Sequence, residues 1–135
     1  MLFTKASEYA LFSLIFIAKK SKPQDVDTIS KELEISKSFL AKILQNMAKD
    51  GILNSFKGVK GGFALARDRD KINLKEIINS AERHEATVFE CSISIEDCPK
   101  KNDKCEIWSI FNSLQLKVDD FLDTITLDDI INKRV

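Results

Sequence analysis

Residues 27–67 (DTISKELEISKSFLAKILQNMAKDGILNSFKGVKGGFALAR) constrain the fold of this chain more than any other stretch. They open with Asp27 and Thr28, polar residues of the kind that start helices, followed by a short amphipathic pattern. Ser36 then begins a second helical pattern, and its hydroxyl can accept a hydrogen bond from a free backbone N–H of the first turn. The stretch therefore predicts two short helices joined by a tight turn.

The second helical pattern has an apolar stripe and a polar opposite face. The stripe that we expect to be buried consists of Phe39, Leu40, Ile43, Leu44, Met47 and Ala48. The opposite side carries Ser38, Lys42, Gln45 and Lys49, with Ser36 and Lys37 at the tip. Gly51 follows and ends the helix, because glycine tolerates the positive φ that such a position needs.

A basic hairpin is predicted after this helix. Two short apolar runs, 52–56 and 63–66, are separated by glycines, with Lys57 and Lys60 at the edges of the turn. Two short helices and such a hairpin make a winged helix-turn-helix. The predicted fold class is thus mainly α with a small β wing, completed by a long C-terminal dimerisation helix.

This arrangement fits double-stranded DNA. A helix fits the major groove, and a glycine-rich hairpin lets the backbone approach a phosphate or the minor groove closely. The candidate DNA-contacting residues are Thr28, Ser36, Lys37, Ser38, Lys42, Gln45, Lys57, Gly58 and Lys60. The alternative is that these lysines form the solvated face of an ordinary α+β domain, but a basic face on this motif favours nucleic-acid binding.

The charge distribution agrees with that interpretation. Residues 1–67 carry 11 basic and 6 acidic side chains, whereas residues 68–135 carry 10 basic and 15 acidic ones. A basic first half suits a protein that presents one end to phosphates. No secretory signal and no apolar run of about 20 residues is present, so we expect a cytoplasmic protein without a membrane segment. No nucleophile–base pair or phosphate loop suggests an enzyme.

Further helices flank this unit. A nearly all-apolar helix is predicted over 7–20, a short helix over 72–81, and a last short helix within 126–133. The helix expected over 106–125 has a broad apolar face that needs a partner, and a second subunit would supply it. The predicted division is a DNA-binding domain over 1–81, a cysteine-containing loop over 82–105, and dimerisation and C-terminal helices over 106–135.

All three cysteines, Cys91, Cys98 and Cys105, fall in that loop at even spacing. Their polar surroundings fit poorly with a buried structural role, and clustered thiols in a reducing compartment more often bind metal or undergo redox chemistry. The close pairs typical of structural zinc are absent. The spacing leaves three alternatives open, namely an iron–sulfur cluster, a redox switch and inert thiols.

The chain resembles the IscR/NsrR/CymR family of bacterial winged-helix transcription regulators over nearly its whole length. The matching features are the opening LFTK at 2–5, ISKSFL at 35–40, the wing FKGVKGGFAL at 56–65, and three cysteines ahead of the long helix. The resemblance implies that Ser36, Ser38 and Lys42 face the major groove, and that Lys57 and Gly58 contact the backbone or minor groove. It also implies a 2Fe–2S or 4Fe–4S cluster that adjusts DNA affinity.

Two features depart from the family pattern. The two cysteine gaps are six residues long instead of five, and Glu106-Ile107-Trp108-Ser109 stands where IscR-like members have a histidine. In some NsrR-like members an acidic residue from the first helix of the partner subunit completes the site, and Glu8 occupies the matching position. A carboxylate in the first turn of a helix also complements the helix dipole, so both roles remain open for Glu8.

The expected protein is a homodimeric repressor whose DNA affinity is controlled by a cluster on Cys91, Cys98 and Cys105, sensing redox, nitric oxide or iron–sulfur status. The first alternative is a cluster-free regulator of the same fold that uses a thiol switch or a partner protein. A further alternative, of another class, is a small iron–sulfur carrier or scaffold, which would show no salt-dependent affinity for DNA.

Overall fold

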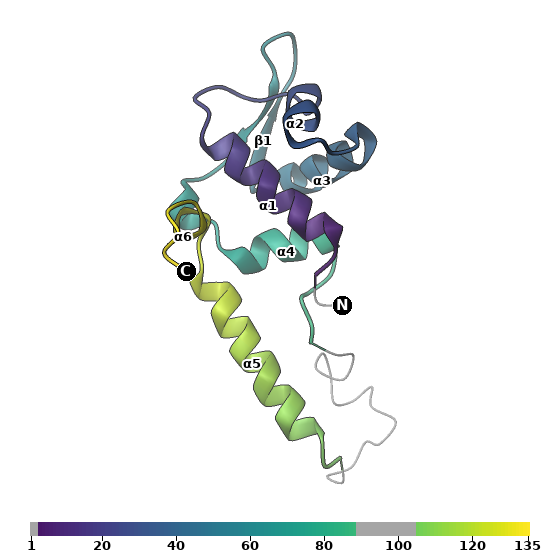
Figure 1. Cartoon of the computed structure of the whole chain (residues 1–135), viewed down its shortest axis with the longest axis vertical. Coiled ribbons are helices and arrows are strands. Elements are labelled where there is room, and N and C mark those ends of the chain that lie inside the picture. Colours follow the sequence, from purple (N-terminus) through teal and green to yellow (C-terminus); the bar gives the residue numbers. More distant parts are fainter. Residues whose placement is uncertain (1–2, 89–104) are drawn as a thin grey trace.

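The structure is a computed structural model that describes residues 3–88 and 105–135. The elements are α1 (Lys5–Ala18), α2 (Val26–Leu33), α3 (Lys37–Lys49), β1 (Leu53–Phe56), β2 (Gly62–Leu65), the 3-10 turn η1 (Arg69–Lys71), α4 (Leu74–Glu82), α5 (Trp108–Thr124) and α6 (Leu127–Ile131). A winged helix-turn-helix unit forms one end of the molecule, and α5 projects from it as a long arm (Figure 1). The predicted fold class, mainly helical with a small β wing, is confirmed.

The core assembles around α1. Thr4 caps this helix, since its Oγ1 accepts the N–H of Ala6 at 3.2 Å, and α1 therefore begins two residues before the predicted start. One broad face is fully buried and contains Ala10, Leu14 and Ile17. Phe12 remains 50% exposed, so the helix is buried on one side and not all round.

The predicted helix-turn-helix is formed by α2 and α3. Asp25 caps α2 by accepting the N–H of Thr28 at 2.8 Å, two residues ahead of the predicted start at Asp27. Glu34 adopts a left-handed φ of 56° and ends α2, so the chain turns directly into α3. On the inner side of α3, Leu40, Ile43, Leu44 and Met47 are buried, as their spacing predicts.

Two predictions about α3 are wrong. Ser36 stands at the cap position but makes no capping bond, because its Oγ lies 3.3 Å from the Oγ of Ser38 and the two hydroxyls pair with each other. Phe39 is 41% exposed and not part of the buried stripe. It lies in the first turn of α3, where its ring meets that of Tyr9 edge-on at 5.6 Å between centroids.

The wing is the antiparallel pair β1–β2, in which Leu53 lies opposite Leu65 and Phe56 opposite Gly62. Gln24 extends this sheet by one bridge, donating its N–H to the carbonyl of Phe63 at 2.9 Å and accepting that of Phe63 at 2.8 Å. A side chain on Gly62 would collide with the backbone of Gln24 at 2.4 Å. The wing is therefore fastened at its base to the loop that leads into α2.

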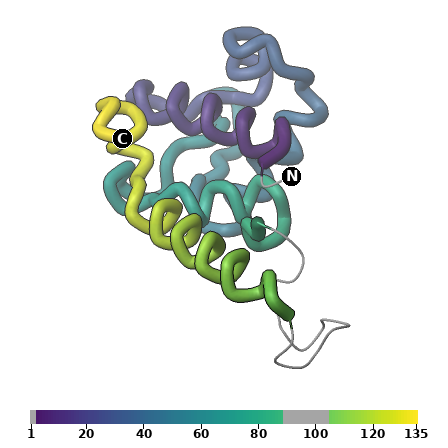
Figure 2. Tube along the Cα trace, turned by 60° about the horizontal axis from the view of Figure 1, so that its bottom comes forward, coloured from purple at the N-terminus to yellow at the C-terminus, as the bar shows by residue number. Residues whose placement is uncertain are grey.

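The C-terminal part of the chain leaves the winged-helix unit and returns to it. Along α5 only Gln115 and Leu122 are buried among the described residues. After α5 the chain turns back, with the N–H of Leu74 donating to the carbonyl of Ile125 at 2.8 Å. The short α6 then lies beside the C-terminal end of α1 (Figure 2). Of the helices in the described ranges, none is long and apolar enough to span a membrane.

Candidate nucleic-acid interface

The outer face of α3 presents the polar side chains predicted to read DNA. Ser38, Lys42 and Gln45 are exposed, on the side opposite the buried stripe of Leu40, Ile43, Leu44 and Met47. Lys49, which is not among the predicted contacts, is exposed at the end of the same face. Ser38, Lys42 and Gln45 also line one shallow hollow together with Phe39 and Ala41. Hydroxyl, ammonium and amide groups on one exposed helical face are groups that can contact base edges or phosphates.

At the tip of the helix-turn-helix, Lys37 and Thr28 have partners within the protein, in addition to the Ser36–Ser38 pair described above. The ammonium of Lys37 lies 2.8 Å from a carboxylate oxygen of Asp27. The hydroxyl of Thr28 donates to Asp25 at 3.0 Å. The backbone N–H that Thr28 donates lowers the pKa of Asp25 below its ordinary value, so this cap stays ionised. Thr28 therefore takes part in capping α2 through its hydrogen bonds to Asp25.

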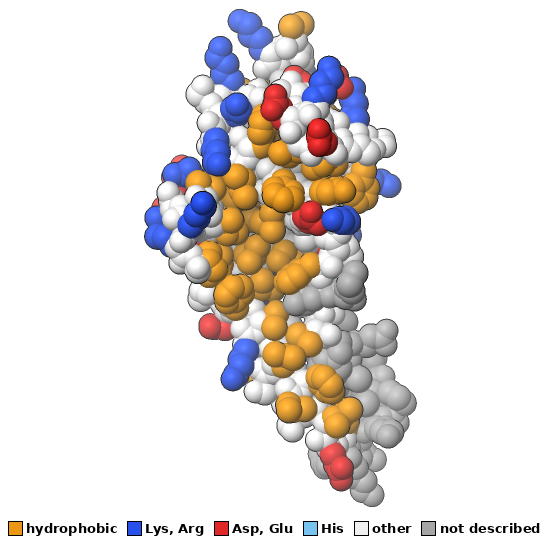
Figure 3. All heavy atoms as spheres, viewed as in Figure 1, with side chains coloured by type: hydrophobic (Ala, Val, Ile, Leu, Met, Phe, Trp, Pro, Cys, Tyr) orange, Lys and Arg blue, Asp and Glu red, His pale blue; other side chains and the backbone are white. Residues whose placement is uncertain are grey.

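The wing carries its charges outward. Lys57, Gly58 and Lys60 are exposed, and Gly58 has a φ of +97° with open space where a side chain would stand. The N–H of Gly61 donates to the carbonyl of Gly58 at 3.0 Å and closes the turn. Within residues 3–88 and 105–135, no ion pair involves Lys42, Lys49, Lys57 or Lys60. Lys and Arg side chains gather over this end of the molecule (Figure 3).

Two arginines that the sequence analysis did not single out hold the recognition helix and the wing in place. Arg67, at the base of the wing, donates to the carbonyls of Gly51 at 3.4 Å and Lys71 at 2.9 Å and pairs with Glu76 of α4. Arg83 pairs with Asp50, the residue that ends α3, at 2.7 Å. The Arg83–Asp50 pair joins residues 33 positions apart, and the Arg67–Gly51 bond joins residues 16 apart, so no local pattern could have revealed them.

The C-terminal end of α4 is also joined to α1. The carboxylate of Glu82 accepts the hydroxyl of Ser7 at 2.6 Å and both the N–H and hydroxyl of Thr4 at 2.7 and 2.8 Å. Partial burial would raise the pKa of Glu82, but these hydrogen bonds outweigh it and hold the pKa below the ordinary 4.5. Glu82 thus places a negative charge at the N-terminal end of α1.

The predicted metal ligands are only partly within the described residues. Cys91 and Cys98 lie outside them. Cys105 is a free, partly exposed thiol just before α5. Glu8 is exposed in the first turn of α1, where its carboxylate lies 2.9 Å from the ammonium of Lys5. Among residues 3–88 and 105–135, no three His, Cys, Asp or Glu side chains are arranged to hold a metal ion.

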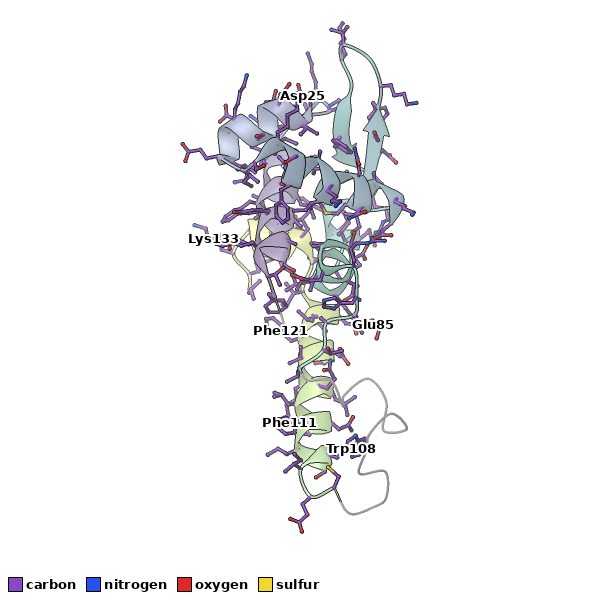
Figure 4. All side chains as sticks on the ribbon, turned by 90° about the vertical axis from the view of Figure 1, so that its right-hand side faces the viewer. Asp25, Glu85, Trp108, Phe111, Phe121 and Lys133 are labelled. Atoms are coloured by element: carbon purple, nitrogen blue, oxygen red, sulfur yellow. The ribbon has the colours of Figure 1, made fainter. Side chains whose placement is uncertain are left out.

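An apolar groove of about 720 Å³ lies between α1, α4 and α5. The apolar residues that line it are Phe3, Leu11, Leu74, Ile78, Val118, Phe121 and Leu122, with Glu8 and Lys117 at its polar parts. Toward the start of α5, on the same side as Phe121, Ile107, Ile110 and Leu114 are 44–68% exposed. Leu116 is 61% exposed, but its spacing places it on the opposite side of the helix. The apolar surface continues from the winged-helix unit down α5 (Figure 3), whose distal end at Trp108 lies far from Asp25 (Figure 4).

Comparison with known proteins assigns the family. The model of the Rrf2 family, described as iron-dependent transcriptional regulators, matches residues 3–133. The chain belongs to the Rrf2 family. It is a helix-turn-helix transcriptional regulator, as the residues and the resemblance to the IscR/NsrR/CymR family predicted, and its family consists of regulators and not of enzymes.

Individual relatives agree with this membership. A protein of Aquifex aeolicus described as an HTH-type transcriptional regulator is 31% identical over 137 residues, covering 98% of this chain and 92% of that protein. The regulator IscR of Klebsiella pneumoniae is 26% identical, covering 99% of this chain and 82% of IscR. The structure of CymR, the global cysteine regulator of Bacillus subtilis, superposes with a TM-score of 0.79 at 21% identity over 97% of this chain and 96% of CymR, which supports the shared fold.

Proposed function

We propose that this Rrf2-family regulator is a cytoplasmic repressor that binds double-stranded DNA through α3 and the wing, as a homodimer under the control of its three cysteines. The observation that carries the DNA-binding part is the exposed polar face of α3 beside a wing whose lysines have no acidic partner in the described part of the chain. Phosphate contacts from Lys57 and Lys60 would position the protein, and Ser36, Ser38, Lys42 and Gln45 would contact the major groove.

The homodimer is inferred from the apolar surface along α5. Phe121 and Leu114 are 50% and 44% exposed, and Phe121 also lines the groove between α1, α4 and α5. A monomer that exposed such a continuous apolar surface would be prone to association. A second copy can cover it, and a two-fold dimer would present two α3 helices to two half-sites.

Control of DNA binding is assigned to an iron–sulfur cluster on Cys91, Cys98 and Cys105. Three thiolates are suitable iron ligands, and the description of the Rrf2 family as iron-dependent supports iron over zinc. Glu8 of the partner subunit is the proposed fourth ligand. Within one chain, α5 carries Cys105 away from the unit that contains Glu8, so a carboxylate from the second copy would be needed (Figure 1). The cluster would respond to redox state, nitric oxide or iron–sulfur status.

A thiol switch without a cluster is the second candidate. It is favoured by two observations, namely the free and partly exposed thiol of Cys105 and the likeness of the fold to CymR. In this version oxidation of the cysteines, or a partner protein, would set the DNA affinity. The carrier or scaffold hypothesis has no such support, because the chain belongs to a family of transcriptional regulators.

One preparation separates these possibilities. Protein purified without oxygen is examined by absorbance, by iron and sulfide counts, and by binding to duplex DNA over a range of salt concentrations. Iron and sulfide in comparable amounts, with DNA affinity that falls steeply with salt, support the cluster-controlled regulator. A colourless, iron-free protein that binds DNA differently when oxidised supports the thiol switch. Absence of DNA binding at low salt overturns the proposal.

A further inference from the structure

Two amide side chains hold the backbone that leads from α4 to the cysteines. Asn79 of α4 accepts the N–H of Ala86 through its Oδ1 at 2.9 Å. Gln115 of α5 accepts the N–H of Val88 through its Oε1 at 2.7 Å and donates from its Nε2 to the carbonyl of Ala86 at 3.0 Å. The same Nε2 also donates to Asp119 at 3.0 Å. We call this arrangement the amide grip.

The amide grip sits in a small apolar core of its own. Ala86 is 3% exposed and packs with Ile78 of α4 and Leu122 of α5, and Gln115 itself is 7% exposed. Buried amide groups without partners are costly, whereas here both ends of the Gln115 side chain are hydrogen-bonded to one short stretch of backbone. The start of the cysteine-bearing segment is therefore fixed to α4 and α5 at once.

We propose that Asn79 and Gln115 are positioning residues that transmit the state of the cysteines to α5. Cys91 follows Val88 by three residues, so ligation or oxidation of the cysteines acts on a chain whose preceding residues are held by the grip. On α5, about one and two turns beyond Gln115, Val118 and Phe121 line the groove of the proposed dimer. The inference rests on the proposed control of DNA binding by the cysteines and names the residues through which it acts.

The amide grip is also connected to the recognition helix α3 through α4. α4 carries Asn79, and the residue that follows α4, Arg83, pairs with Asp50 at the end of α3. A change in how α5 sits on α4 therefore reaches both the dimer surface and the recognition helix through elements in direct contact. Such a switch requires that Asn79 and Gln115 hold the backbone of residues 86–88 with different free energies in the two cysteine states. Only such a difference can shift the equilibrium between two conformations.

The test compares Gln115→Glu with Asp120→Asn. Glutamate keeps the shape of Gln115 but replaces the N–H donor with a second acceptor facing the carbonyl of Ala86 and the carboxylate of Asp119. Asp120 is exposed on the same helix and serves as the matched control. For each protein, affinity for a random-sequence duplex is measured at low salt with the cysteines reduced and after oxidation by diamide, and again with and without bound iron. Amide hydrogen exchange at residues 86–88 reports whether the grip has opened.

The expected result is a change in affinity between cysteine states of about fivefold or more for the wild type and Asp120→Asn, and of less than about twofold for Gln115→Glu. Asn79→Ala, which removes only the bond to Ala86, should change its DNA affinity between cysteine states by a factor between those two values. Faster exchange at 86–88 with an unchanged ratio overturns the inference while leaving the proposed function intact. A wild type whose affinity is the same in every cysteine state overturns both.

Discussion

The ammonium of Lys37 lies 2.8 Å from the carboxylate of Asp27, so the first residue of the recognition helix is tied to the helix before it. Both side chains are more than half exposed, at 61% and 58%, and such a pair contributes at most about 1 kcal/mol to stability. Its main consequence concerns DNA. A lysine already paired with a carboxylate neutralises a phosphate less effectively, and Asp27 places a negative charge at the proposed interface.

Removing Asp27 should therefore strengthen DNA binding. In Asp27→Asn we expect higher affinity for DNA. The slope of log affinity against log salt concentration should steepen by about one unit, because Lys37 is freed to contact one phosphate. Glu32→Gln, which removes an exposed acid from the same helix, is the control. Titration of duplex DNA at several salt concentrations provides the measurement. An equal gain in both variants would mean that general charge and not Lys37 is responsible.

Replacing Lys57 and Lys60 with alanine should weaken binding to every DNA sequence. It should also flatten the slope of log affinity against log salt concentration by up to about two units, one for each lost phosphate contact. Both lysines are exposed on the wing, where they can reach phosphates without reading bases. The double variant Lys71→Ala/Lys133→Ala removes the same charge from elsewhere on the surface. If the wing variant keeps the salt slope of the wild type, the wing does not contact the DNA backbone.

Ser38→Ala or Lys42→Ala should change the preference among DNA sites more than the overall affinity. Both side chains line the shallow hollow on the outer face of α3, where contacts with base edges are worth about 1–3 kcal/mol of discrimination each. Selection from a random pool of duplexes by each variant and by the wild type measures this directly. The control is Lys49→Ala, at the last residue of α3. If affinity falls equally for all sequences, Ser38 and Lys42 contact phosphates and do not read bases.

The sequence predicted the helices, the wing and the outer face of α3 because these follow from local spacing and composition. It missed contacts made by side chains that have more than one possible partner. The hydroxyl of Ser36 pairs with Ser38 instead of capping α3, and Lys37 pairs with Asp27 across the turn. Gln115 could not be found either, since its helical pattern gives no sign that the backbone of residues 86–88 lies against it. Contacts between distant segments require the folded structure.

Stability should fall in acid partly through Glu82. Its pKa is held below the ordinary 4.5 in the folded protein, so its contribution is present above that value and is lost as the pH falls through the lowered pKa. Glu82→Gln should lower the free energy of unfolding by about 1 kcal/mol at pH 7, because the bonds from Ser7 and Thr4 lose a charged acceptor. Urea unfolding from pH 7 to pH 3 measures both effects. A variant that loses as much stability on acidification as the wild type would assign the acid sensitivity to other carboxylates.

Phe121→Glu should convert the proposed dimer into a monomer. Phe121 is 50% exposed and lines the apolar groove, and a charge there could not be buried against a second copy without a large cost. Leu116→Glu is the matched control, because Leu116 is 61% exposed on the same helix but does not line the groove. Light scattering after gel filtration gives the mass, and circular dichroism verifies that both variants are folded. If Leu116→Glu alone dissociates the protein, or if both variants remain dimeric, then the second copy does not occupy the groove between α1, α4 and α5.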